Sequence, residues 1–252
     1  MILSMSGKKV IVVTSWDDGL IYDKKLYETL DYYGIKGTFF VIVGKIGKPG
    51  YLSEDLVKEI SLCHEVGSHT LSHPNLTNID LKKAEYEIYM SKCMLEKIIG
   101  SKVYGLCYPK GYYNSCVATI ARKYYIYART IKIKMNIIDK DLFHIHTLIQ
   151  ARDLDIFSRR YAATLLVFKK DPRRVIRVIK SNSWDKIAIE LFDFLLMKGG
   201  IFHLWGHSYE IEKNNDWKKL ENILSYIAWR SNVEYMTLYE LCKYHSSTLY
   251  KI

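Results

Sequence analysis

The 252-residue chain has few of the residues that mark a cross-linked or thiolate-metal protein. Its five cysteines are odd in number and include no Cys-x-x-Cys pair, so the sequence gives no sign of a disulfide framework or of a zinc site built from thiolates. We expect reduced, buried thiols, which favour an intracellular compartment. Proline is also scarce, with four residues, and no linker rich in proline or glycine divides the chain. We therefore predict one domain over residues 1–252, with its core at residues 9–245.

Long hydrophobic runs and long basic runs are absent as well. No apolar stretch reaches the roughly 18 residues that a membrane-spanning helix needs, and residues 1–9 lack a basic segment followed by a long apolar one. These features predict a cytoplasmic protein with no membrane span. The net charge is +10. Because lysine and arginine are scattered, we interpret this charge as a solvated surface and expect no nucleic-acid partner.

What the sequence does contain is a regular alternation of strand-like and helix-like segments. Hydrophobic residues make up 49% of the chain, which is enough for a sizeable core. The alternation predicts an α/β fold in which about seven parallel strands close, or nearly close, into a distorted (β/α) barrel. The predicted strands are 9–16, 37–43, 66–68, 103–108, 126–130, 201–207 and 233–237. The predicted helices are 23–33, 53–66, 80–99, 114–125, 153–169, 183–197, 215–229 and 238–245, and residues 131–150 stay unassigned.

Two adjacent carboxylates, Asp17 and Asp18, close the first predicted strand. The strand before them is apolar, and desolvating an ionised carboxylate without a partner costs several kcal/mol. A metal ion is the most plausible partner. Gly19 follows at once and lets the chain turn there, so one carboxylate can bind the metal while the other stays free. A free carboxylate within reach of metal-bound water can act as a general base.

A second motif supplies the nitrogen ligands that such a metal needs. His69 and His73 are four residues apart, so one turn or tight loop can aim both imidazoles at one point, and Pro74 stiffens the exit. A His-x-x-x-His pair alone is a weak signal, but the upstream Asp-Asp-Gly strengthens it. Both motifs follow predicted strands, and the carboxyl ends of parallel strands meet at one face of a barrel.

A third group of chemically capable side chains lies on the sixth predicted strand. His203, Trp205 and His207 share one face of that strand. His207 is nearest the catalytic end, whereas His203 lies ~13 Å deeper, at four strand rises, and is expected to be a satisfied core histidine. Trp205 is a candidate to stack on a sugar ring. Glu210 is either a partner for a histidine or a surface charge.

With these motifs, Ser-Trp-Asp-Asp-Gly and His-Thr-Leu-Ser-His-Pro, the sequence resembles the polysaccharide deacetylase family, the NodB-homology carbohydrate esterases of family 4. The resemblance extends over roughly residues 9–245. It implies that Asp17 is the general base and that His207 protonates the leaving amine. It also implies that a divalent metal, most often zinc, with cobalt, manganese or nickel as alternatives, is held by Asp18, His69 and His73. The implied fold is a distorted barrel of about seven strands, in agreement with the strand count above.

The third motif departs from the commonest family form. Many members carry an arginine that orients the base, and Cys107 stands at that place, in a Tyr-Pro-x-Gly variant of the motif. Arg129 and Arg152 are candidates to replace the arginine. Tyr108 is a candidate to donate its backbone N–H or its hydroxyl to a developing oxyanion, and Tyr108 and Pro109 are expected to contact substrate.

The resemblance implies a metal-dependent hydrolase that removes N-acetyl groups from the amino sugars of a polysaccharide or glycoconjugate. A same-fold amidohydrolase acting on a small linear or cyclic amide is the alternative. A carbohydrate-binding module without catalysis is less favoured, because a binder needs no base beside its metal. The expected partner is thus a carbohydrate or a small amide, and the sequence leaves the oligomeric state open.

Overall fold

The computed structural model describes residues 9–139, 141–167 and 172–249. In these residues nine strands form one sheet, and the paired strands run parallel to one another. The order along the sheet is β6-β5-β4-β3-β2-β1-β8-β7, and β9 pairs with β1. The strands are β1 Val10–Asp18, β2 Gly37–Val41, β3 Glu65–Ser68, β4 Gly105–Cys107, β5 Tyr127–Ile133, β6 Ile145–Thr147, β7 Ile149–Gln150, β8 Gly200–Gly206 and β9 Val233–Tyr235.

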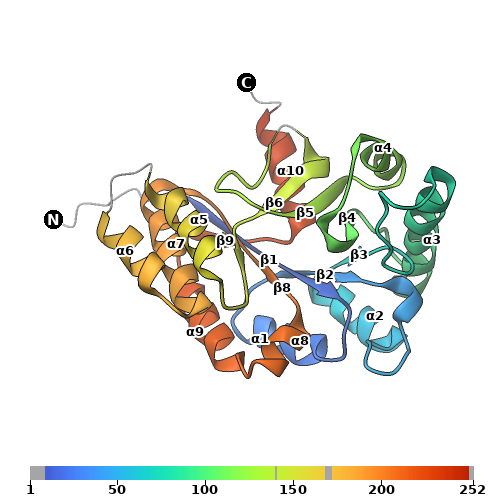
Figure 1. Cartoon of the computed structure of the whole chain (residues 1–252). Helices are drawn as coiled ribbons and strands as arrows, with labels where there is room; N and C mark the ends of the chain where they lie inside the picture. The colour runs from blue at the N-terminus through green and yellow to red at the C-terminus, as the bar shows by residue number, and fades with distance from the viewer. Residues whose placement is uncertain (1–8, 140, 168–171, 250–252) are drawn as a thin grey trace.

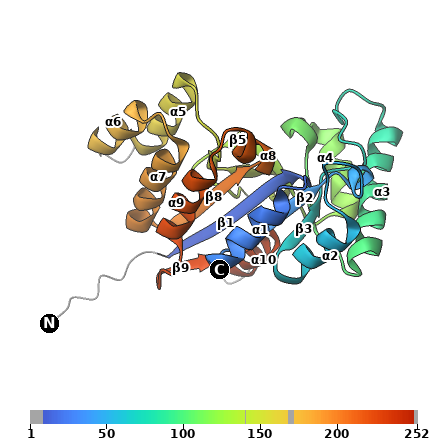
Figure 2. The same ribbon diagram turned by 90° about the horizontal axis from the view of Figure 1, so that it is seen from below.

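Helices connect the strands and cover the outside of the sheet (Figure 1). Figures 1 and 2 both show α2, α3 and α4 on one flank of β1 and α5, α6 and α7 on the opposite flank. None of the helices in the described part of the chain is long and apolar enough to span a membrane. The helices are α1 Asp23–Tyr32, α2 Glu54–Cys63, α3 Leu81–Ile99, α4 Ser115–Tyr124, α5 Ile156–Val167, α6 Pro172–Lys180, α7 Trp184–Lys198, α8 Ser208–Lys213, α9 Trp217–Ile227 and α10 Leu238–Leu249.

The helix boundaries follow from local chemistry in the first half of the chain. The side chains of Ser53, Asp80 and Asn114 each accept a hydrogen bond from a backbone N–H in the first turn of α2, α3 and α4. Gly100 ends α3 in the left-handed conformation, with a φ of 70°. The predicted helices 53–66, 80–99 and 114–125 begin at these three capping residues, and the second ends directly before Gly100.

The barrel is nearly closed, because the two end strands of the sheet, β6 and β7, both lie next to β8. The backbone N–H of Leu148, between β6 and β7, donates to the His203 carbonyl at 3.2 Å, and the His203 Nδ1 lies 2.9 Å from the His146 carbonyl. Both nitrogens of His203 are engaged, since its Nε2 lies 2.8 Å from the Ser15 hydroxyl. His203 is therefore the satisfied core histidine that the sequence predicts.

The sheet register brings the carboxyl ends of the strands together. Asp18 of β1 lies beside Val41 of β2, and Trp16 lies beside Gly206 of β8. On the far side of the sheet, Cys107 of β4 is the register partner of Arg129 of β5. The residues that end or follow these strands consequently face one region, as expected for a barrel.

The predicted barrel fold is confirmed. The described residues form nine strands, because the seven predicted ones are joined by β6 and β7, which lie in the unassigned stretch 131–150. The sequence reading also missed α6 and α8, and the helix predicted at 215–229 begins only at Trp217. The predicted helix end at Lys169 lies outside the described residues.

Candidate active site

A cavity of about 470 Å³ opens at the carboxyl ends of the strands. It is lined by residues that lie in or follow six strands, β1, β3, β4, β5, β7 and β8. Pro109, which the sequence proposed as a substrate contact, does not line it. Seven other proposed site residues do: Asp17, Asp18, His69, His73, Tyr108, Trp205 and His207.

Three of the lining side chains converge as a metal site would require. The Nε2 atoms of His69 and His73 are 3.1 Å apart, and the Asp18 Oδ1 lies 3.7 Å from the first and 3.9 Å from the second. Ligands held 2.0–2.2 Å from one zinc ion in a tetrahedral arrangement lie roughly 3.4 Å apart. The three donor atoms thus fit a divalent cation.

Local backbone geometry aims these ligands. Asp18, Thr70 and His73 all have positive φ, at 82°, 65° and 64°, which L-residues seldom adopt and which costs about 1–3 kcal/mol each. Such backbone strain persists only where the surroundings enforce it, and here it occurs at two of the three ligands. In addition, the His69 Nδ1 lies 2.9 Å from the Cys107 carbonyl. An N–H donated there leaves Nε2 as the free ligand atom.

The charges of the three ligands also suit a cation. Burial lowers the pKa of His69 to about 3 and lowers that of His73, so both imidazoles are neutral and able to ligate. Burial and the neighbouring Asp17 charge raise the pKa of Asp18 to about 6. A carboxylate that is hard to ionise in the protein alone is one that a bound cation would stabilise.

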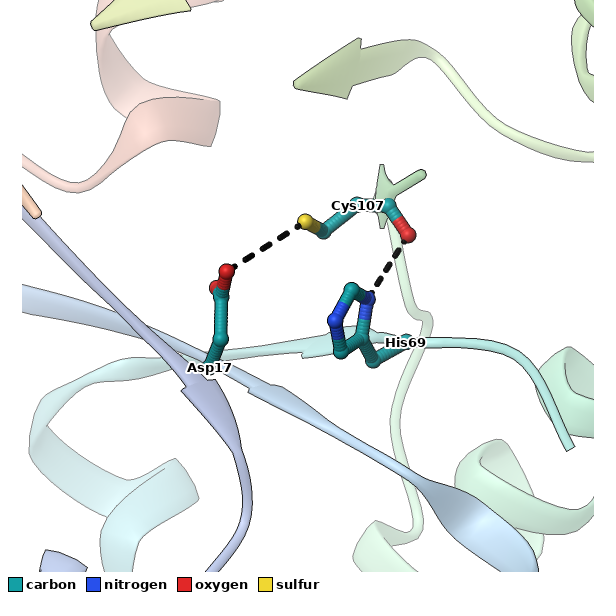
Figure 3. A group of neighbouring side chains, drawn as sticks. All are labelled: Asp17, His69 and Cys107. Atoms are coloured by element: carbon teal, nitrogen blue, oxygen red, sulfur yellow. Dashed lines mark hydrogen bonds between the residues drawn. The ribbon is translucent and has the colours of Figure 1, made fainter. Parts of the chain in front are cut away.

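A second cluster, Asp17, His69 and Cys107, also brings three potential ligand atoms together (Figure 3). The Cys107 thiol points toward Asp17 at 3.7 Å. However, the Arg129 guanidinium donates to both oxygens of Asp17 and lies 2.9 Å from the Cys107 sulfur. Burial raises the pKa of the Cys107 thiol well above its usual range. A guanidinium cation already fills this place, so the cluster of Asp18, His69 and His73 is the better candidate for a metal site.

Arg129 thus occupies the position that the missing third-motif arginine leaves open. Its side chain is fully buried, with its guanidinium 4.9 Å from the Trp205 ring and 5.3 Å from the Phe40 ring. Burial alone would raise the pKa of Asp17, but the charge of Arg129, helped by His69 and His207, lowers it below its usual value. Asp17 is therefore an ionised, oriented carboxylate. The other candidate, Arg152, pairs with Glu210 instead, at 3.3 Å.

His207 has a carboxylate partner close to it in sequence. Its Nδ1 lies 2.9 Å from the Glu210 Oε2, and Glu210 also accepts from the Gln150 amide at 3.2 Å and from Arg152. Burial alone would lower the pKa of His207, but the bond to Glu210 and the charges of Asp17 and Asp18 raise it above its usual value. The raised pKa favours the protonated imidazole, and the contact at Nδ1 leaves Nε2 free. Of the two interpretations of Glu210, the histidine partner is the one the structure shows.

The proposed substrate contacts are less open than the sequence suggests. The Tyr108 backbone N–H already donates to the Arg129 carbonyl at 3.2 Å, which argues against that N–H as an oxyanion donor. The Tyr108 ring stacks on Tyr113 with centroids 4.9 Å apart. Trp205 is 5% exposed and carries Arg129 over its ring, which leaves little face for a sugar. Tyr209, 38% exposed in the cavity wall, is a more accessible aromatic ring.

Comparison with known proteins identifies the family. Residues 4–128 match the polysaccharide deacetylase family, and the chain belongs to that family through this segment, about half of its length. A peptidoglycan-N-acetylglucosamine deacetylase of Bacillus cereus is 30% identical over 120 residues, 47% of this chain and 54% of the relative. The chain thus spans about half the length of the curated relatives that it matches.

Solved structures extend the likeness over nearly the whole chain. A polysaccharide deacetylase of Mycobacterium smegmatis, whose activity is assigned only provisionally, superposes with a TM-score of 0.70 and 14% identity, covering 98% of this chain and 93% of that one. A family 4 acetyl xylan esterase of Clostridium thermocellum, solved with a cobalt ion, gives a TM-score of 0.61 and 16% identity, covering 92% of this chain and 89% of that one. At these identities the likeness shows the shared fold.

Proposed function

We propose that the protein is a metal-dependent hydrolase that removes N-acetyl groups from amino sugars of a polysaccharide or glycoconjugate. The observation that carries the proposal is the arrangement of three functions around one cavity. The ligand atoms of Asp18, His69 and His73 lie together, Asp17 is held ionised beside them by Arg129, and His207 lines the same cavity with a raised pKa. The match to the polysaccharide deacetylase family and the likeness to a peptidoglycan-N-acetylglucosamine deacetylase support the same chemistry.

The residues divide the work as follows. Asp18, His69 and His73 would hold a divalent cation, which by analogy with the family is zinc. When bound, this cation would stabilise negative charge and activate water. Asp17, fixed by Arg129, accepts the proton of the attacking water. His207 protonates the departing amino-sugar nitrogen through Nε2 while Glu210 holds Nδ1. The products are acetate and a free amino sugar.

Acetate release from N-acetylated chitooligosaccharides tests the proposal. Activity should disappear with a chelator and return with zinc or cobalt. Asp17→Asn should keep its full metal content and lose on the order of 10²–10⁴-fold in kcat, the range for removing a general base. If acetate is not released but a small cyclic imide or ureide is turned over, the same-fold amidohydrolase is the correct function. Activity that survives in Asp17→Asn contradicts the assignment of the base.

A further inference from the structure

Asp23 is a buried carboxylic acid outside the proposed catalytic set. It is the first residue of α1 and has no exposed surface. Within the described residues, neither of its carboxyl oxygens has a hydrogen-bond partner, and the same holds for the buried hydroxyl of Ser208, the first residue of α8. Burying an unpartnered polar group costs roughly 1–3 kcal/mol in proteins. Two such groups together therefore call for a physical explanation.

The Ser208 hydroxyl lies close enough to the Asp23 carboxyl to affect its ionisation. Burial raises the pKa of Asp23 to about 8, while the neighbouring Ser208 hydroxyl opposes this rise. The negative charges of Asp18 and Asp17 raise the pKa further, and the positive charge of His207 acts against them. At neutral pH the Asp23 side chain is consequently an uncharged acid, able both to donate and to accept a hydrogen bond.

Asp23 and Ser208 each follow one of the two strands, β1 and β8, that carry residues of the site. Asp23 follows Asp18 by five residues, after the turn that leaves β1. Ser208 follows His207 directly, where the chain leaves β8. The two strands are neighbours, with Trp16 beside Gly206. A bond between the Asp23 carboxyl and the Ser208 hydroxyl would tie the start of α1 to the start of α8, and so fix the peptide that carries the His207 ring.

We propose that Asp23 and Ser208 form a positioning pair that holds His207 in place beside the metal-binding end of β1. The pair touches neither substrate nor metal and acts through the backbone of residues 207 and 208. The inference rests on the proposed role of His207 as the acid. An apolar side chain would fill the same space without the cost of burying a carboxyl group, so the chain here keeps two buried polar groups at the expense of stability.

Three variants of the full chain test the pair. Asp23→Asn is neutral and has a donor and an acceptor, so it should retain kcat within about threefold. Asp23→Leu and Ser208→Ala remove the contact and should each lower kcat at least tenfold, with KM within twofold and metal content unchanged. Asp55→Asn is the matched control, since Asp55 also lies in the first turn of a helix but is 97% exposed at its side chain.

A readout without turnover separates this inference from the proposed function. The imidazole carbon and nitrogen resonances of His207, observed by NMR in the zinc-loaded protein, should move in Asp23→Leu and Ser208→Ala and stay in place in Asp23→Asn and Asp55→Asn. If the wild type releases no acetate, the proposed function is wrong. The His207 resonances would still test whether Asp23 and Ser208 position that residue. Unchanged His207 resonances, or a kcat within twofold of wild type in Ser208→Ala, overturn the inference. If Asp23→Leu does not fold, Ser208→Ala decides alone.

Discussion

The carboxylate of Glu210 sets the protonation state of the proposed acid. It lies 2.9 Å from the His207 Nδ1 and helps to raise the pKa of that imidazole. A histidine with a raised pKa is protonated below that pKa and loses its proton as the pH rises through it. Glu210→Gln removes the charge, so the pKa of His207 should fall. The basic limb of the profile of kcat/KM against pH should therefore move to lower pH, with a loss of about 10–100-fold at neutral pH.

Glu221→Gln is a suitable control for this prediction. Glu221 lies on α9, and among the described residues its ion pair is with Lys218, at 3.6 Å, so its removal should leave the profile unchanged. A basic limb that stays in place in Glu210→Gln would mean that His207 is not the group whose deprotonation limits the reaction.

Single residues differ in how far the sequence can predict their roles. Asp17, Asp18, His69 and His73 belong to short motifs, so spacing along the chain is enough to propose them together. Arg129 lies 112 positions from Asp17, and sequence reasoning left it as one of two candidates. What selects it is the register of β4 with β5, which places it beside Cys107. That register is a property of the folded sheet.

One glycine determines how closely two of these strands can approach. A methyl group at Gly105 of β4 would lie 2.2 Å from the ring carbon and hydroxyl oxygen of Tyr127 on β5. That ring is buried and its hydroxyl is bonded to Glu65 at 2.7 Å, so it cannot swing aside. Gly105→Ala should destabilise the fold by about 1–3 kcal/mol or more, as overpacking does. It should also lower activity, because β4 carries Cys107. Urea unfolding monitored by circular dichroism measures the change.

Gly100→Ala provides the matched comparison. Gly100 has left-handed geometry, with a φ of 70°, and a methyl group there meets nothing within 4 Å. Its substitution should cost only the strain of a left-handed alanine, about 1–2 kcal/mol, and leave activity intact. If both variants are equally stable and equally active, close packing between β4 and β5 does not position the site.

At the level of elements, strong local signals were predictable and tertiary ones were not. The helices with clear caps, α2, α3 and α4, were predicted to within a few residues. The strands β6 and β7 contain three and two residues, too few to show a period. They form because β5 and β8 offer open edges. The helix α8 has six residues, and the sequence gives no signal that separates it from the segment before α9.

The whole fold makes the metal site, since its ligands come from distant parts of the chain. Asp18 ends β1, whereas His69 and His73 follow β3, and only the parallel sheet brings their ligand atoms within 4.8 Å of one another. The unfolded chain has no comparable site. A cation that binds the folded state alone stabilises it by RT ln(1 + [L]/Kd), about 2.7 kcal/mol at a hundredfold excess over Kd.

Zinc should therefore raise the thermal unfolding midpoint of the wild type, and His69→Ala should abolish that rise. His245→Ala, which alters a histidine of α10 outside the cavity, should keep it. Because protons compete for the Asp18 carboxylate, whose pKa is raised to about 6 without metal, the rise should shrink as the pH falls below 6 and be full above it. Differential scanning calorimetry at several pH values measures this. An equal zinc-induced rise in His69→Ala would place the bound ion elsewhere and contradict the ligand set proposed above.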